Sequence, residues 1–149
     1  MHCVTFAAPP VSQPPISPPD PVSNAAHSQG HFLAVINEGD PVPLAQEAYI
    51  LKLLDVYSKT IPKLQEEGFD QFVVPHPVMK LSGNCILLRD ENPEDANSFN
   101  IRAYSAKAEV LQSKLFGNPL EHFMIEYQAR IYKVLELESS RDKEMEIDL

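Results

Sequence analysis

The sequence has few basic residues and no long apolar run, and both shortages exclude classes of protein. Only 12 Lys and Arg residues stand against 21 Asp and Glu, giving a net charge of −9. This deficit of positive charge argues against nucleic acid and against anionic membrane surfaces as partners. No segment reaches the roughly 18 apolar residues of a membrane-spanning helix, so we expect no transmembrane segment.

Cysteine is also scarce: the sequence contains two, Cys3 and Cys85. Two cysteines are too few for a disulfide framework, and both lie in apolar, strand-like contexts that are typical of core residues. Cys3, His27 and His31 show no metal-ligand spacing, and the sequence contains neither a phosphate loop nor a dinucleotide fingerprint. We therefore expect no metal and no cofactor.

The length of 149 residues and the apolar content of 44% fit one globular domain. The first residues lack the basic start and apolar core of a secretory signal. The default expectation for the compartment is therefore cytoplasmic.

Five consecutive apolar residues at 32–36 are followed by a polar break that contains Asp40. Such a run is typical of a strand covered on both faces, as in a parallel sheet between helices. Gly39 permits a sharp turn, and the prolines at 41 and 43 prevent the strand from continuing. We therefore expect an α/β fold with Asp40 at the carboxyl end of a buried strand, where such sheets place their sites. The alternative is that Asp40 merely caps the following helix.

Further strand patterns occur along the chain. Residues 4–8 favour a strand, and a two-strand element is expected from 72–74 and Val78 through 85–88. Residues 85–88 and 99–103 are predicted to form an antiparallel pair, because the latter alternate between apolar and polar side chains. Serine, glycine and asparagine at 82–84 supply turn chemistry before the first strand of this pair.

A helix is predicted from Leu44 to about Ser58, with Pro43 in its first turn. Its expected buried face is broad and comprises Leu44, Ala48, Ile50, Leu51, Leu53, Leu54 and Tyr57. Seven of the fourteen prolines lie in 9–21, which excludes helix and central strand there. We expect a proline-rich surface loop over 9–30, with an SH3-type ligand as the alternative.

A second helix is predicted from Asn118, because an N-cap residue is followed by proline and, three residues after the cap, by Glu121. His122 falls in its first turn. The helix should run to about Leu137 and bury Leu120, Phe123, Met124, Tyr127, Ile131 and Val134. The acidic residues 138–149 should form an irregular, solvated tail.

Three segments resemble the class 3, or fungal-type, lipases, which are α/β-hydrolases. Residues 37–43 resemble the segment that carries the triad aspartate, and 116–127 resemble the segment that carries the triad histidine. Residues 2–10 resemble the strand that follows the nucleophile helix. The resemblance implies that residues 1–137 are the C-terminal part of such a domain, so that the α/β-hydrolase sheet is incomplete.

The resemblance implies a serine hydrolase of acylglycerols or related lipid esters that needs no cofactor. Asp40 would hold the imidazole of His122 in the correct tautomer, and His122 would act as general base and then general acid. The acid precedes the histidine in the chain, as in α/β-hydrolases. Two alternatives remain: His122 is an ordinary surface or capping residue, or it forms a thiol dyad with Cys85, although a cysteine in an apolar strand is usually inert.

The nucleophile is missing from the pattern. An α/β-hydrolase serine sits in G-x-S-x-G, but no two of the five glycines flank a serine in that way. Lys80 stands where Ser82 would need its first glycine, and the oxyanion donors would lie upstream of Met1. We therefore expect the isolated chain to be inactive, with a lipid or ester substrate only if an upstream half completes it. The alternative is a non-catalytic, lipase-derived binding protein or a truncated gene product. The fragment hypothesis also predicts an exposed sheet edge along 4–8.

Overall fold

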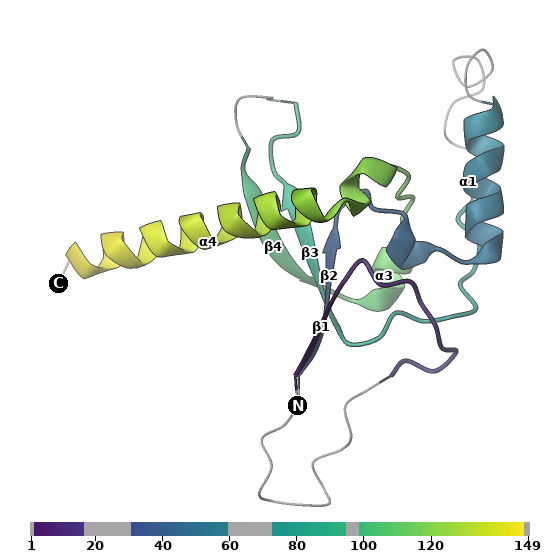
Figure 1. Cartoon of the computed structure of the whole chain (residues 1–149), viewed down its shortest axis with the longest axis horizontal. Coiled ribbons are helices and arrows are strands. Elements are labelled where there is room, and N and C mark those ends of the chain that lie inside the picture. Colours follow the sequence, from purple (N-terminus) through teal and green to yellow (C-terminus); the bar gives the residue numbers. More distant parts are fainter. Residues whose placement is uncertain (1, 17–30, 60–72, 95–98, 148–149) are drawn as a thin grey trace, which may run out of the picture.

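The structure, a computed structural model, describes residues 2–16, 31–59, 73–94 and 99–147. The described residues form a mixed four-stranded sheet with three α-helices, an α/β arrangement (Figure 1). The strands, in their order across the sheet, are β1 (Cys3–Phe6), β2 (Phe32–Asn37), β3 (Asn84–Asp90) and β4 (Ile101–Ala106). The first three are parallel, and β4 pairs antiparallel with β3.

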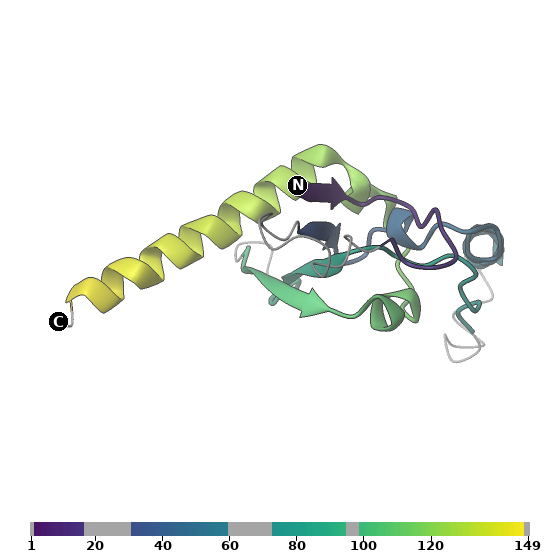
Figure 2. The ribbon, with the colours of Figure 1, turned by 90° about the horizontal axis from the view of Figure 1, so that it is seen from below.

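The helices lie on the two sides of this sheet. They are α1 (Glu47–Lys59), α3 (Ala108–Gln112) and α4 (Met124–Ile147), and two 3-10 turns, η2 (Val42–Leu44) and η4 (Pro119–His122), precede α1 and α4. The N-terminal half of α4 lies against the sheet and its C-terminal half extends beyond it, whereas α1 lies beside the sheet at the other end of the molecule (Figure 2).

Successive side chains of a strand point to opposite faces of the sheet, so the strands contribute residues to two hydrophobic cores. The core under α4 contains Ala7, Leu88, Ile101 and Tyr127, with Val35, Ile86, Ile131 and Val134 packed against them. The core on the α1 and α3 side contains Ala34, Ile36, Leu44, Tyr49, Leu53, Leu81, Cys85, Leu87, Leu111 and Phe116. The central strands β2 and β3 contribute to both cores, and this explains their nearly continuous apolar sequences.

Several strand predictions are confirmed. The apolar run at 32–36 is a strand with parallel neighbours on both sides, and the predicted antiparallel pair forms with Leu88 opposite Ala103. Strand β1 is the edge of the described sheet, as the fragment hypothesis predicted, and its Val4 and Phe6 are 50% and 38% exposed. It ends at Phe6, and the next residue, Ala7, adopts a positive φ of 47° shortly before Pro9 and Pro10.

Helix α1 begins at Glu47 rather than Leu44, and its predicted buried face is confirmed only for Leu53 and for Leu44, which lies in η2. The prediction is wrong for the other apolar residues. Ile50, Leu51, Leu54 and Tyr57 are 45–59% exposed, whereas Tyr49 and Leu53 are buried. The hydroxyl of Tyr49 donates to the carbonyl of Phe116 at 2.8 Å and accepts from its amide at 2.7 Å. These two bonds fix the rotation of α1 about its axis and turn its other apolar residues away from the core.

The strand expected over 72–78 is also absent from the described part of this segment, 73–78, and Phe72 lies outside the described residues. Pro75 and Pro77 remove two backbone donors that a ladder would need. A side chain replaces the missing strand partner, because the Gln46 Oε1 accepts from the amides of Val78 and Met79, each at 2.8 Å.

The C-terminal helix differs from its prediction at both ends. Phe123 is extended (φ −66°, ψ 135°) and separates η4 from α4, so Leu120, Phe123 and Met124 are 53–62% exposed rather than buried. Helix α4 continues past Leu137 to Ile147, where we expected an irregular tail, because no proline or glycine follows Pro119.

Only part of the expected proline-rich loop lies in the described residues, since 17–30 are outside them. Ser12 forms an isolated antiparallel bridge with Lys80, and the amide of Ile16 donates to the Ser82 hydroxyl at 2.9 Å. Residues 9–16 therefore run back along the segment that leads into β3.

Candidate active site

Asp40 lies where the sequence placed it, in the turn after the carboxyl end of the central strand β2. Its amide donates to the carbonyl of Asn37 at 3.2 Å, and Gly39 has a φ of +99°, a conformation that favours glycine. The turn directs the Asp40 side chain into the protein, and the residue is fully buried.

Two hydrogen bonds dock η4 against this turn. The amide of Asn118 donates to the carbonyl of Gly39 at 3.0 Å, and the side-chain amide of Asn37 donates to the carbonyl of Glu121 at 2.9 Å. Asn118 is the predicted N-cap, since its side-chain oxygen accepts from the amide of Leu120 at 3.2 Å. The cap and the docking contacts together fix the backbone that carries His122.

This arrangement brings His122 against Asp40 from 82 residues away. The His122 Nδ1 lies 3.2 Å from the Asp40 Oδ2, and the aspartate side chain is 0% exposed while the histidine side chain is 45% exposed. A buried carboxylate is an acceptor, so the neutral imidazole in this contact carries its proton on Nδ1 and its free lone pair on Nε2. The pair therefore presents a partly exposed base that a buried acid orients.

The remaining hydrogen bonds of Asp40 leave its carboxylate little freedom. Its Oδ1 accepts from the amide of Val42 at 2.9 Å, at the start of η2, and its Oδ2 also accepts from the Tyr127 hydroxyl at 2.9 Å. That hydroxyl in turn accepts from the amide of Asn37 at 2.9 Å. One Asp40 oxygen thus binds the backbone at the start of η2, and the other binds the histidine and the tyrosine. Helix α1, which the capping alternative concerned, begins only at Glu47.

Burial determines the protonation of two neighbouring groups. Burial raises the pKa of the Tyr127 phenol well above its ordinary value, and the charge of Asp40 raises it further, so the hydroxyl remains a donor at neutral pH. Burial also raises the pKa of Glu121, while the nearby Arg130 guanidinium opposes that rise. The Arg130 Nη2 lies 2.6 Å from the Glu121 Oε2, and its Nη1 donates to the carbonyl of Leu88 at 3.1 Å.

The sequence identified Asp40 and His122 but missed the residues that hold them. Tyr127 was predicted only as part of an apolar helix face, although a tyrosine in a buried stripe signals a hydroxyl that needs a partner. Asn37 and Glu121 lay within the two resembling segments but were given no role at the site, and Arg130 carried no recognisable motif. The catalytic role of Asp40 and His122 remains a prediction, because their contact shows proximity and orientation rather than activity.

The other chemical candidates fare differently. Cys85 is 1% exposed within the α1-side core, and burial raises the pKa of its thiol, which disfavours the nucleophilic thiolate. Among the described residues no group of three His, Cys, Asp or Glu side chains could hold a metal ion. His31 stacks on His2 with ring centroids 5.2 Å apart, and His27 lies outside the described residues.

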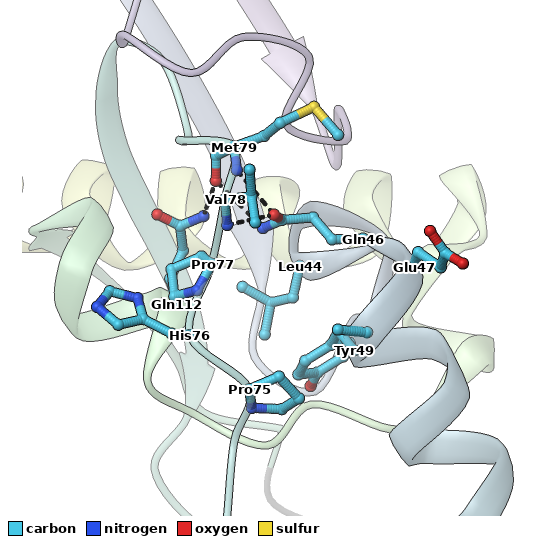
Figure 3. Close-up of a pocket in the computed structure, with 11 residues that line it drawn as sticks. Leu44, Gln46, Glu47, Tyr49, Pro75, His76, Pro77, Val78, Met79 and Gln112 are labelled. Carbon is cyan, nitrogen blue, oxygen red and sulfur yellow. Dashed lines mark hydrogen bonds between the residues drawn. The ribbon is translucent and has the colours of Figure 1, made fainter.

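A separate pocket of about 270 Å³ opens between the start of α1, α3 and residues 75–79 (Figure 3). The side-chain amides of Gln46 and Gln112 both donate to the carbonyl of Met79, at 3.1 and 2.8 Å. Neither Asp40 nor His122 lines this pocket. Its lining is mostly apolar, so its polar groups serve mainly to fix the backbone of 78–79.

Comparisons with protein-family models, with curated proteins and with solved structures find no match to this chain. None of the helices in the described ranges is long and apolar enough to cross a membrane.

Proposed function

We propose that this chain is the C-terminal part of a serine ester hydrolase of the class 3 lipase type, which acts on lipid carboxylic esters. The observation that carries the proposal is the contact between the His122 Nδ1 and the buried Asp40 Oδ2 at 3.2 Å. Two segments that resemble the acid and histidine segments of that family thus meet in space. The acid also precedes the histidine in the chain, as it does in α/β-hydrolases.

The proposed chemistry follows from this geometry. The Nε2 of His122 would take the proton of a nucleophilic hydroxyl as that hydroxyl attacks the ester carbonyl. The buried charge of Asp40 would stabilise the resulting imidazolium, which would then protonate the departing alcohol. In this mechanism Asp40 takes up no proton itself and supplies orientation and charge.

The nucleophile must come from outside this sequence, since no serine stands in a G-x-S-x-G pattern. The open edge of the described sheet supports such a completion. Among the described strands β1 pairs with β2 alone, and its Val4 and Phe6 are 50% and 38% exposed. Pairing of a further strand with β1 would extend the sheet on the side away from β3.

The missing nucleophile is also the observation that favours a second candidate, a non-catalytic, lipase-derived binding protein. Such a protein would keep Asp40 and His122 as structural residues, in line with the bond from Val42 to Asp40. The two candidates differ in whether a reactive serine exists in the assembled protein.

An activity-based label separates them. The endogenous protein, tagged after Leu149, would be captured and treated with a fluorophosphonate, which reacts covalently with activated serines. The hydrolase proposal expects a labelled serine in the polypeptide or complex that contains residues 1–149. His122→Ala and Asp40→Asn should each slow the labelling by orders of magnitude.

The matched control is His76→Ala, because His76 lines the pocket beside α1 rather than the candidate active site. It should leave the labelling rate unchanged. If the captured protein carries no labelled serine, or if His122→Ala labels as fast as the parent, the hydrolase proposal fails and the binding protein is favoured.

A further inference from the structure

One oxygen atom of the candidate active site serves two donors. The Asp40 Oδ2 accepts from the His122 Nδ1 at 3.2 Å and from the Tyr127 hydroxyl at 2.9 Å. Tyr127 is 1% exposed, and its ring packs edge-on against Phe6 with centroids 5.8 Å apart. The phenol therefore reaches the acid from inside the protein, on a side that a substrate cannot enter.

The direction of each hydrogen bond at this tyrosine is determined. The amide of Asn37 can only donate, so the Tyr127 oxygen accepts from it and uses its single proton elsewhere. The Asp40 carboxylate can only accept, so that proton points at Oδ2. The backbone amide of Asn37 in β2 thus fixes the Tyr127 hydroxyl, and the hydroxyl in turn fixes the Asp40 carboxylate.

We propose that Tyr127 is a positioning residue of the Asp40–His122 pair, an inference that rests on the function proposed above. Its hydroxyl holds Oδ2 toward the Nδ1 proton of His122, which keeps the free lone pair of the imidazole on Nε2. Without the hydroxyl, the partners of the Asp40 carboxylate among the described residues are the amide of Val42 and the histidine itself. The amide of Asn37 also loses its acceptor. Because this amide is then a buried donor without a partner, it attracts the nearby carboxylate of Asp40. The carboxylate then turns away from His122.

The test measures the state of His122 directly and needs no esterase activity. Diethyl pyrocarbonate acylates the unprotonated nitrogen of neutral imidazoles, and peptide mapping by mass spectrometry gives a separate rate for each of the five histidines. The chain would be studied at a concentration at which gel filtration shows a monomer. In the parent, His122 should react readily, since its Nε2 carries the lone pair and its side chain is 45% exposed.

Tyr127→Phe removes the hydroxyl and keeps the ring. We expect the acylation rate of His122 to fall by roughly tenfold, because partners beyond a functional histidine change its behaviour by about that factor. The rates of the other histidines should not change. Tyr132→Phe, on the same helix at a site that is 68% exposed, is the matched control and should leave every rate at the parental value.

Three results would overturn the proposal. The first is a Tyr127→Phe chain that melts cooperatively and acylates His122 at the parental rate. The second is a uniform change at all histidines, which would indicate a structural role only. If Tyr127→Phe does not fold, 4-aminophenylalanine at position 127 provides the test, since its amine still donates to Asp40. A parental His122 rate then supports the proposal, and a slow rate in that folded variant is the third result against it.

Failure of this inference is distinguishable from failure of the proposed function. Fluorophosphonate labelling reports whether a serine is activated, whereas acylation of His122 reports only how Asp40 and Tyr127 hold the imidazole. A Tyr127-dependent His122 in a protein without a labelled serine would retain the positioning role and reject the hydrolase.

Discussion

Replacing Arg130 with methionine should destabilise the protein more than any exposed ion pair could. The guanidinium lies 2.6 Å from the Glu121 carboxylate, the two side chains are only 9% and 18% exposed, and a second nitrogen donates to the carbonyl of Leu88. Removing one partner of a buried pair leaves an uncompensated charge and costs about 3–5 kcal/mol. Because Glu121 keeps some contact with solvent, we expect the lower end, about 3 kcal/mol, in the free energy of unfolding.

The loss should depend on pH in a defined direction. Burial raises the pKa of Glu121 while Arg130 lowers it, so Arg130→Met leaves the raising effects unopposed and the pKa rises further. A carboxyl whose folded pKa lies above its unfolded value binds its proton more tightly in the folded state, and protonation therefore favours folding as the pH falls. The stability gap between Arg130→Met and the parent should narrow as the pH is lowered from neutral to about 4.

Urea denaturation followed by circular dichroism measures both quantities. Lys133→Met is the matched control on the same helix, because Lys133 pairs with Glu136 at 3.4 Å where the side chains are 37% and 70% exposed. Its cost should stay below about 0.5 kcal/mol. Adding Glu121→Gln to Arg130→Met should recover part of the loss. Equal losses for Arg130→Met and Lys133→Met, or a gap that does not change with pH, would refute the reasoning.

Three further predictions concern the sheet. Val4→Lys should reduce self-association of the chain in analytical ultracentrifugation, because a lysine on β1 disfavours pairing at the open edge of this strand. The control Val11→Lys, at a 70% exposed site outside the strands, should leave self-association unchanged. Ile101→Ala should lower the free energy of unfolding by about 2–5 kcal/mol, since Ile101 is fully buried under α4, against little change for the 51% exposed Val110→Ala. Gly83→Ala should cost about 2 kcal/mol or more in the same urea assay, because φ is +81° and a Cβ would lie 2.6 Å from the Phe32 carbonyl oxygen. Parental stability of either Ile101→Ala or Gly83→Ala would contradict the packing described here.

The parts of the fold that the sequence predicted are those with local causes. The apolar run of β2, the glycine at 39 and the two prolines after Asp40 determine a strand, a turn and the position of the acid within a dozen residues. The antiparallel pair of β3 and β4 and the cap at Asn118 are likewise encoded by neighbouring residues. No distant part of the chain needs to be known for any of them.

The errors arise where a distant contact decides between local options. Apolar residues cover so much of the surface of α1 that periodicity alone could not choose the buried face. The choice depends on the bonds between Tyr49 and Phe116, which are 67 residues apart. In the same way, residues 73–78 read as a strand until Gln46, from an earlier segment, is seen to occupy the backbone donors of Val78 and Met79.

The break at Phe123 is the error with the largest consequence for the candidate site. In a continuous helix from Asn118, His122 and Tyr127 would be five residues apart and would therefore point about 140° away from each other around the axis. They could not both reach one carboxylate oxygen. The extended conformation of Phe123 separates η4 from α4 and resets their relative rotation, so that both side chains converge on the Asp40 Oδ2. A sequence pattern that fits one helix thus hides two elements, and the site depends on the residue between them.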